Sequence, residues 1–383
     1  MEEMSINKLQ ASLMRDYYRY FSKYARGNKP DKKVAWVTSF APIEILEALD
    51  ILYYYPESYA AVIAASGKEQ ELLQESNNNN LTSDCCSYSC CIEGCLIKED
   101  GPRGTPPLPD VLIATNNQCN TLPNWWSILA VRYNIPLIII DYPGEYNDSR
   151  ESFEYVKKQH IDLIKKLEVL SGNKMDYKKL EALIESSRKS VYSWKRITSL
   201  MKDYNVNPTM LFDSITYLII SRCKTETSIL YKLMANEIKA IEKYNNDLIN
   251  IFWIGYPLWY HQDRYLASEL EDFKIVGSNY ITWWNLNYKG NDVFEKLYNA
   301  YNYTFLNLKQ TTRTKLLNKV IRTSGATCAI SMHNKSCKCD FVSSKDLSIP
   351  KTEVEIDMID RYFPDMERIK KQIQLIKDTI CTK

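Results

Sequence analysis

The sequence predicts an α/β protein with two parallel-sheet domains, and two observations carry that prediction. The first is a strand–helix–strand unit in residues 108–143, where apolar runs at 110–115 and 137–140 flank a helical pattern. Such a unit requires parallel strands and a right-handed crossover. The second is a region beginning at residue 248 that again alternates apolar runs with helical stretches. Both domains are therefore expected to be of the flavodoxin or Rossmann type.

Four segments are expected along the 383 residues. Residues 1–30 form a helical N-terminal arm, because apolar side chains recur there at helical spacing before a Gly-Asn-Lys-Pro stop. Residues 31–150 form the first α/β domain. A helical middle segment covers 151–245, and its Lys/Glu alternation is typical of solvated helix faces. The second α/β domain covers 246–383.

In the first domain, strands are expected at 33–38 and 52–55, before the unit described above. Ser39 can cap the helix that follows the first strand, and Pro42 suits the first turn of that helix. Glu44 lies where the helix dipole favours an acid. The ordinary interpretation of Glu44 is a helix-start acid, and the functional one is a carboxylate aimed at the crevice beyond the strand ends.

In the second domain, strands are expected at 248–254, 273–276 and 326–331, with a helix at 315–322. Each half of the chain then ends a strand on a loop that carries a cysteine. Two sheets facing each other across a shared site are consistent with this arrangement.

Composition excludes several classes of protein. A formal charge of +2 provides no basic field for nucleic acid. No apolar run approaches the roughly 20 residues that cross a bilayer. The N-terminus has no signal-peptide pattern, so a cytoplasmic location is expected. The sequence contains no P-loop, GxGxxG or GxSxG motif, which leaves nucleotide-binding and serine-hydrolase functions without support.

The cysteines indicate metal or redox chemistry. Eleven are present, with five in 85–95 and three in 328–339. In a reducing compartment they argue against disulfides. Cys119 follows a parallel strand, where α/β sheets bind ligands, although a buried structural cysteine is the alternative for a single thiol. The spacings do not match paired zinc knuckles, so an iron–sulfur cluster held by loops of both domains fits best, with zinc as the alternative.

Several motifs together resemble the 2-hydroxyacyl-CoA dehydratase family, whose close relatives are the benzoyl-CoA reductase-like proteins. They are DCCSY at 84–88, ATNNQCNT at 114–121, IP at 135–136 with DYP at 141–143, and HNKSCK at 333–338. The form of the Asn-Asn-Gln-Cys loop resembles the β subunit of these heterodimeric enzymes.

The resemblance implies a [4Fe-4S] cluster with Cys86, Cys119 and Cys337 as its ligands. It implies a hydro-lyase that works as a heterodimer with a homologous α subunit. An ATP-dependent iron–sulfur activator protein would supply one electron, and (R)-2-hydroxyacyl-CoA would lose water through a ketyl radical to give enoyl-CoA. Such chemistry belongs to anaerobic amino acid fermentation. Ser39 and Glu44 match positions that can face the cluster or the substrate, and they are the candidate catalytic residues.

Two other functions stay open at this point. One is a homodimeric double-cubane or benzoyl-CoA reductase-like ATP-dependent reductase, and the other is a non-catalytic subunit that only relays electrons. The cysteines that the motif does not use are the reason for the first alternative: Cys85, Cys90, Cys91, Cys95 and Cys339. The sequence does not indicate which acyl group the substrate carries.

Overall fold

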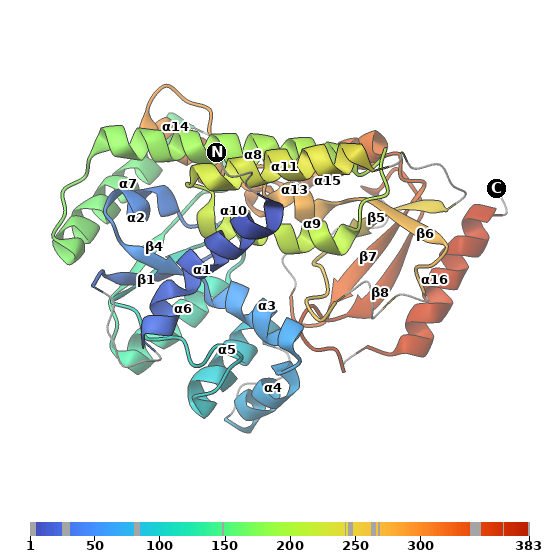
Figure 1. The fold of residues 1–383 in the computed structure, drawn as a ribbon, viewed down its shortest axis with the longest axis horizontal. Helices are drawn as coiled ribbons and strands as arrows, with labels where there is room; N and C mark the ends of the chain where they lie inside the picture. The colour runs from blue at the N-terminus through green and yellow to red at the C-terminus, as the bar shows by residue number, and fades with distance from the viewer. Residues whose placement is uncertain are drawn as a thin grey trace.

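Two four-stranded parallel sheets form the framework of the molecule (Figure 1). The expected α/β class is confirmed. The computed structural model describes residues 5–24, 31–79, 85–147, 149–241, 243, 248–261, 266, 269–337, 346–362 and 364–381. Within these residues no helix is long and apolar enough to span a membrane.

Both sheets share one strand order. The first is arranged β2-β1-β3-β4 and the second β6-β5-β7-β8, so in each sheet the order reverses beside the first strand of the set. The strands are β1 (Val34–Val37), β2 (Leu52–Tyr54), β3 (Val111–Thr115), β4 (Leu137–Ile140), β5 (Ile249–Ile254), β6 (Phe273–Ser278), β7 (Cys328–Asn334) and β8 (Lys351–Ile356).

Helices cover the sheets and fill the space between them. They are α1 (Ile6–Tyr24), α2 (Ile43–Ala48), α3 (Pro56–Ser66), α4 (Glu69–Asn78), α5 (Ser87–Lys98), α6 (Thr121–Tyr133), α7 (Arg150–Ser171), α8 (Tyr177–Leu200), α9 (Pro208–Ser214), α10 (Thr216–Ser221), α11 (Thr225–Ala240), α13 (Asn279–Trp283), α14 (Val293–Asn302), α15 (Gln310–Ser324) and α16 (Met366–Cys381). Short 3-10 turns occupy Gly144–Asn147 and Phe305–Asn307.

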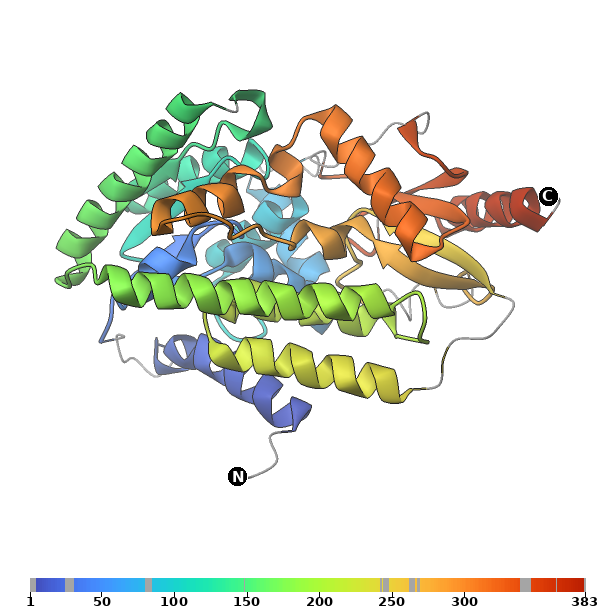
Figure 2. The same cartoon turned by 90° about the horizontal axis from the view of Figure 1, so that it is seen from above.

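The middle of the chain forms a helical layer against one side of the molecule. The long helices α8 and α11 run side by side, and the N-terminal helix α1 packs on α11 and α10 (Figure 2). Leu9 and Leu13 bury the apolar face of α1, as their helical spacing predicts. Tyr17 extends this packing, because its hydroxyl accepts the backbone N–H of Tyr55 at 2.9 Å.

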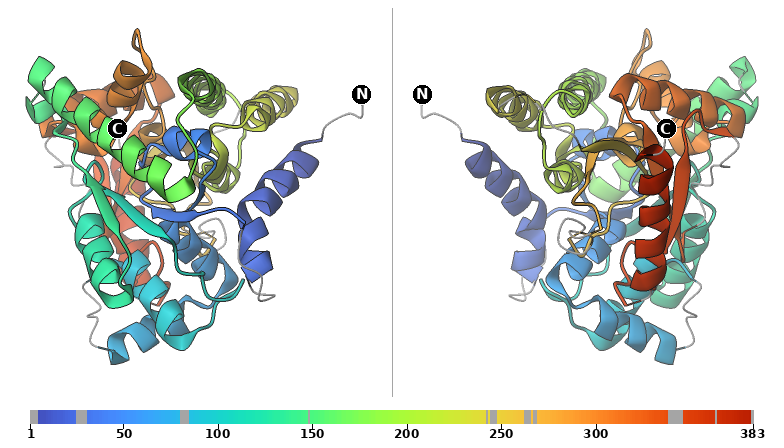
Figure 3. Two further views of the ribbon diagram at one scale, coloured as in Figure 1. Left: turned by 90° about the vertical axis from the view of Figure 1, so that its left-hand side faces the viewer. Right: turned by 90° about the vertical axis from the view of Figure 1, so that its right-hand side faces the viewer.

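Every strand expected from the sequence is present, and one strand was missed. β8 pairs with β7 at the edge of the second sheet, and α16 packs along it (Figure 3). Its alternation of buried Thr352, Val354 and Ile356 with more exposed residues is the pattern of a half-buried edge strand. The division of the chain into four segments at 30, 150 and 245 stays a prediction.

A fully buried ion pair joins the first sheet to the helical layer and to the second half of the chain. Arg222 Nε lies 3.4 Å from Glu44 Oε1, and both side chains have no exposure. Arg222 also donates to the carbonyl of Ala41 and to the Tyr301 hydroxyl, both at 2.8 Å. Tyr301 in turn donates to Glu44 Oε2 at 2.6 Å. Arg222 and Tyr301 thereby fix the segment after β1, which carries Ala41 and Glu44.

The carboxylate of Glu44 has further donors, so its oxygens are saturated. The hydroxyls of Ser187 in α8 and of Tyr288 donate to Glu44 Oε1 at 2.7 Å and 2.8 Å. A buried charge needs such donors because it has lost its water. Glu44 therefore has a structural role at the start of α2, as the buried partner of Arg222.

Replacing Arg222 with methionine is expected to destabilise the protein strongly. The change leaves the Glu44 charge buried without its cation, and losses on breaking a buried pair are about 3–5 kcal/mol. The double variant Glu44→Gln/Arg222→Met is expected to recover part of the loss, because no charge is then stranded. Thermal unfolding midpoints of both single variants and the double variant measure this.

The control is Arg188→Met, since Arg188 pairs with Glu185 on the exposed side of α8. That pair is expected to contribute about 1 kcal/mol or less. A loss for Arg222→Met no larger than that of Arg188→Met would contradict the structural role of the buried pair.

Candidate functional site

The two sheets direct the carboxyl ends of their central strands toward one region. In the first sheet β1 pairs with β3, and the strand order reverses between them, so the loops after both strands open beside the same crevice. Ser39 lies in the first of these loops and Cys119 in the second. In the second sheet the equivalent loops follow β5 and β7. Such reversal points are where open α/β sheets bind ligands.

Three partly buried cysteines meet at this region. Cys86 immediately precedes α5, Cys119 lies just before α6, and Cys337 follows β7. Burial raises the pKa of the Cys86 thiol well above its usual range, and the nearby Cys337 and Cys119 raise it further. Burial raises the pKa of Cys119 to about 12, with Cys337 as the next cause. These electrostatic effects are consistent with three thiols that lie in one region.

Backbone N–H groups at two helix starts point to the sulfur atoms. Those of Ser89 and Tyr88 act on Cys86 and lower its thiol pKa, against the stronger effect of burial. Those of Leu122 and Thr121 do the same for Cys119. Helix N-termini favour negative charge, so these positions suit thiolates.

A chain of polar contacts fixes Cys337 beside Cys86. The side-chain oxygen of Asn334 accepts the backbone N–H of Cys337 at 3.1 Å and that of Ser336 at 3.0 Å. The Ser336 hydroxyl donates to Asp357 at 2.6 Å and lies 2.9 Å from the Ser87 hydroxyl. Ser87 is the residue after Cys86, so the loop of the second sheet is held against the start of α5.

The three thiols are ligands of the type that an iron–sulfur cluster takes. Across the described ranges, no three His, Cys, Asp or Glu side chains are grouped closely enough to hold one ion. A cubane is larger than an ion, and its thiolate ligands stand farther apart. Three thiols from three segments, with N–H donors at two of them, match that requirement.

A carboxyl group with an altered acidity lies at the same crevice. Glu57 stands in the first turn of α3, and its Oε2 accepts both the backbone N–H and the hydroxyl of Ser39 at 3.0 Å. Gln118, next to Cys119, lies 3.4 Å from Oε1. Burial raises the pKa of Glu57 to about 7, although the hydrogen bonds from Ser39 and Gln118 oppose the shift. An acid with that pKa can give or take a proton at neutral pH.

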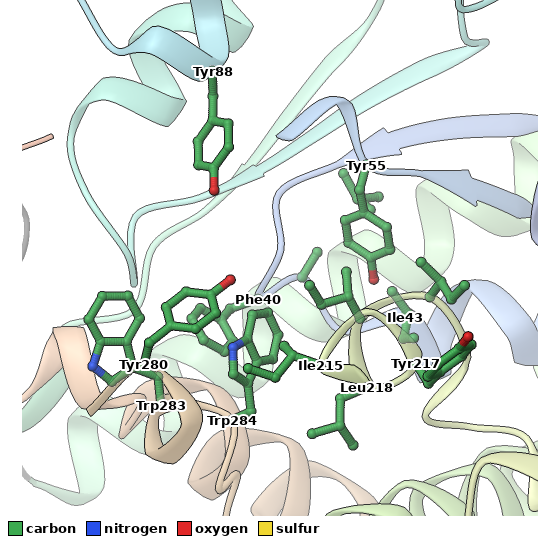
Figure 4. Packing of buried hydrophobic residues seen from close by; sticks show 14 of the residues in the cluster. Phe40, Ile43, Tyr55, Tyr88, Ile215, Tyr217, Leu218, Tyr280, Trp283 and Trp284 are labelled. Atoms are coloured by element: carbon green, nitrogen blue, oxygen red, sulfur yellow. The ribbon is translucent and has the colours of Figure 1, made fainter. Parts of the chain in front are cut away.

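A cavity of about 300 Å³ opens beside Ser39, Glu57 and Gln118. Aromatic side chains form much of its lining, and Figure 4 shows Phe40 beside Tyr280, Trp283 and Trp284, with Tyr88 directed toward them from α5. This volume is at the lower end of small-molecule sites, and the lining combines an apolar wall with a few polar groups.

Four of the five predicted site residues lie at this crevice, and one points elsewhere. Ser39 lines the cavity, and Cys86, Cys119 and Cys337 approach one another next to it. Glu44 is directed into the buried network with Arg222 instead.

Sequence analysis missed Glu57. A signal was available, because an acid directly after Pro56 opens the helix that follows β2, at the same edge of the sheet as Ser39.

The surplus cysteines lie mostly in the core. Cys90, Cys91 and Cys95 are buried in α5, which packs against α4 and α3. Cys85 is exposed at the surface. Cys339 lies outside the described residues.

Fold and site together define an α/β protein with a partly buried three-thiol site beside an apolar cavity. A family model described as 2-hydroxyglutaryl-CoA dehydratase, D-component, matches residues 38–376. The chain belongs to this family and is a dehydratase subunit, hence a hydro-lyase component.

Curated relatives agree with this assignment. The chain is 29% identical to lactoyl-CoA dehydratase subunit alpha of Anaerotignum propionicum, over 80% of this chain and 78% of the relative. It is 30% identical to the (R)-2-hydroxyisocaproyl-CoA dehydratase alpha subunit of Clostridioides difficile, over 82% of this chain and 79% of the relative. A more distant match is the (R)-phenyllactyl-CoA dehydratase alpha subunit of Clostridium sporogenes. It is 25% identical over 80% of this chain and 77% of the relative.

The dehydratase relatives correct one expectation. They are named alpha subunits, so the predicted resemblance to a β subunit is not supported. The Asn-Asn-Gln-Cys loop was a poor guide because its residues also serve the fold. Asn117, for example, is fully buried and donates to the carbonyl of Tyr301 at 2.8 Å.

Glu57 is expected to make the stability of the iron-free protein depend on pH. The Glu57 carboxyl group loses its proton near pH 4.5 in the unfolded chain and near pH 7 in the folded chain. Between these two pH values the folded state therefore binds more protons than the unfolded state. The stabilisation is complete below the unfolded pKa and is lost as the pH rises to about 7. The loss is about 3 kcal/mol.

The measurement is the free energy of chemical unfolding at about pH 5 and about pH 8 for wild type and Glu57→Gln. Glu57→Gln is expected to lack the fall, whereas Glu154→Gln, at an exposed position of α7, is expected to keep it. An unchanged fall in Glu57→Gln would show that another group causes it.

Proposed function

We propose that the chain is the substrate-binding, cluster-bearing subunit of a 2-hydroxyacyl-CoA dehydratase that converts (R)-2-hydroxyacyl-CoA into enoyl-CoA and water. The observation that carries this proposal is the meeting of the three cysteines with Ser39, Glu57 and an apolar cavity. A subunit that only relayed electrons would have no use for a cavity with a proton-active carboxyl group. The alpha-subunit names of the relatives support the same choice.

Cys86, Cys119 and Cys337 would hold a [4Fe-4S] cluster. When bound, such a cluster supplies one-electron chemistry and, at an iron without a protein thiolate, a Lewis-acid position. The N–H groups at the starts of α5 and α6 would stabilise the thiolates. The polar chain from Asn334 to Ser87 would keep the ligand of the second sheet in place.

Glu57 and Ser39 supply the proton chemistry. Dehydration breaks the C–O bond at the α-carbon and a C–H bond at the β-carbon, forms the C=C bond and releases water. A group must therefore accept the β-proton, or deliver a proton to the departing hydroxyl. Glu57 is suited to this because its pKa is close to neutrality. Ser39 orients the carboxyl group with two hydrogen bonds to one oxygen.

Two partners follow from this function. An ATP-dependent iron–sulfur activator would deliver the electron, and a homologous second subunit would complete the enzyme. The described cysteines give no support to the double-cubane reductase, because Cys91 and Cys95 lie in the hydrophobic core.

Anaerobically isolated protein is expected to carry about four iron atoms per chain. Cys119→Ala is expected to lose most of this iron, because one of three ligands is removed. Iron analysis and the visible absorption spectrum measure it.

The matched controls replace cysteines away from the site, namely buried Cys328 in β7 and exposed Cys381 in α16. Both alanine variants are expected to retain iron. Full retention in Cys119→Ala, or zinc in place of iron, would refute the cluster assignment.

We expect dehydration of 2-hydroxyacyl-CoA when this chain is combined with its partner subunit, the activator, ATP and a reductant. The chain with activator alone is expected to show little turnover.

Glu57→Gln is expected to lower kcat by about 100-fold or more, because it removes the group that exchanges the proton. Glu154→Gln serves as the control. A Glu57→Gln enzyme with normal kcat would exclude the carboxyl group from catalysis.

A further inference from the structure

The cavity has a continuous aromatic wall assembled from both halves of the chain. Phe40 and Trp284 have ring centroids 4.7 Å apart, which joins the loop after β1 to the end of α13. Tyr280 continues the wall to Trp283 at 5.1 Å and to Tyr256 at 5.2 Å. Figure 4 shows how Phe40, Tyr280, Trp283 and Trp284 gather below Tyr88.

This wall begins at the reacting groups. Phe40 follows Ser39 directly, and its backbone N–H donates to Gln118 at 3.3 Å. Tyr88 lies two residues after Cys86, and both Glu57 and Cys86 influence its hydroxyl electrostatically. A substrate whose α- and β-carbons lie beside Glu57 therefore extends its side chain along aromatic surface.

A second part of the lining consists of small residues. Ser58, Ala61, Val62 and Ala65 lie at the spacing of one face of α3, and all four line the cavity. Their short side chains leave room next to the aromatic rings.

Among the residues that the structure describes, the lining offers no lysine or arginine to an acidic substrate. Its two carboxyl groups are those of Glu57 and Asp213. A carboxylate buried there would lose its water without gaining a lysine or arginine from the described lining, and a nearby acid in its ionised form would repel it. A methyl group, in contrast, would leave part of the space beside the rings unfilled.

We propose that the site selects 2-hydroxyacyl-CoA substrates with a bulky, uncharged side chain, either branched aliphatic or aromatic, over those with a carboxylate or a methyl group. This inference rests on the proposed function for its assignment of the acyl end of the substrate. Its physical basis is apolar burial against the aromatic wall, with the small face of α3 providing the space.

The test compares four CoA thioesters that differ only in the side chain: isobutyl, benzyl, methyl and carboxyethyl. With the complete enzyme, kcat/KM for the isobutyl or benzyl substrate is expected to exceed that for the methyl and carboxyethyl substrates by roughly tenfold or more. An equal or higher value for the carboxyethyl or methyl substrate would overturn the inference and leave the proposed function intact.

Binding provides a second readout that needs no turnover. Quenching of tryptophan fluorescence by each thioester reports on the cavity, which Trp259, Trp283 and Trp284 line. If no thioester is dehydrated, the proposed function fails, and the order of the dissociation constants still decides the side-chain preference. Failure of all four thioesters to bind would overturn both.

The variant Ala61→Phe tests whether α3 determines the side-chain preference. Ala61→Phe narrows the space beside the rings and is expected to weaken isobutyl and benzyl binding by roughly tenfold while changing methyl binding much less. Tyr192→Ala, at an exposed tyrosine of α8, is the control and is expected to leave all four unchanged. An equal loss for all four thioesters in Ala61→Phe would show that α3 does not contact the side chain.

Discussion

The buried pair of Glu44 and Arg222 is the interaction on which the arrangement of the site depends. Arg222 holds the carbonyl of Ala41 in the loop after β1, and Glu44 receives the hydroxyl of Tyr301 from the second half of the chain. A charge pair without water tolerates little displacement, because each lost hydrogen bond leaves a buried polar group unpaired. The loop that carries Ser39 is therefore fixed relative to both the helical layer and α14.

This constraint explains why two similar sheets make one site. Each sheet reverses its strand order beside β1 or β5, and the loops beyond those points carry Ser39, Cys119 and Cys337. Cys86 at the start of α5 and Glu57 at the start of α3 complete the set. Neither sheet has a complete set of groups by itself. Cys86 and Cys119 come from the first half and Cys337 from the second, so a cluster would also stabilise the contact between them.

The sequence was most informative where local patterns determine structure. The strand, turn and helix around Cys119 follow from β-branched runs and helix signals within 108–143, and they place the thiol at a strand end.

Glu44 shows the limit of such reasoning. Its position in the first turn of α2 was correctly predicted, but its direction depends on Arg222, which lies far away in the sequence. Glu57 was missed for the same reason, since its burial, which raises its pKa, depends on segments distant in the sequence that pack around it, among them those of Ser39 and Gln118. The aromatic wall likewise combines segments that the sequence separates widely.

The central claim is that the three cysteines hold one iron–sulfur cluster beside Glu57 and the cavity. A crystal structure of anaerobically prepared protein, with anomalous diffraction recorded at the iron absorption edge, tests it most directly. The account predicts a single group of iron peaks bonded to the sulfur atoms of Cys86, Cys119 and Cys337, next to Glu57. Iron bound instead by Cys90, Cys91 or Cys95, or a lone zinc ion at the three thiols, would contradict it.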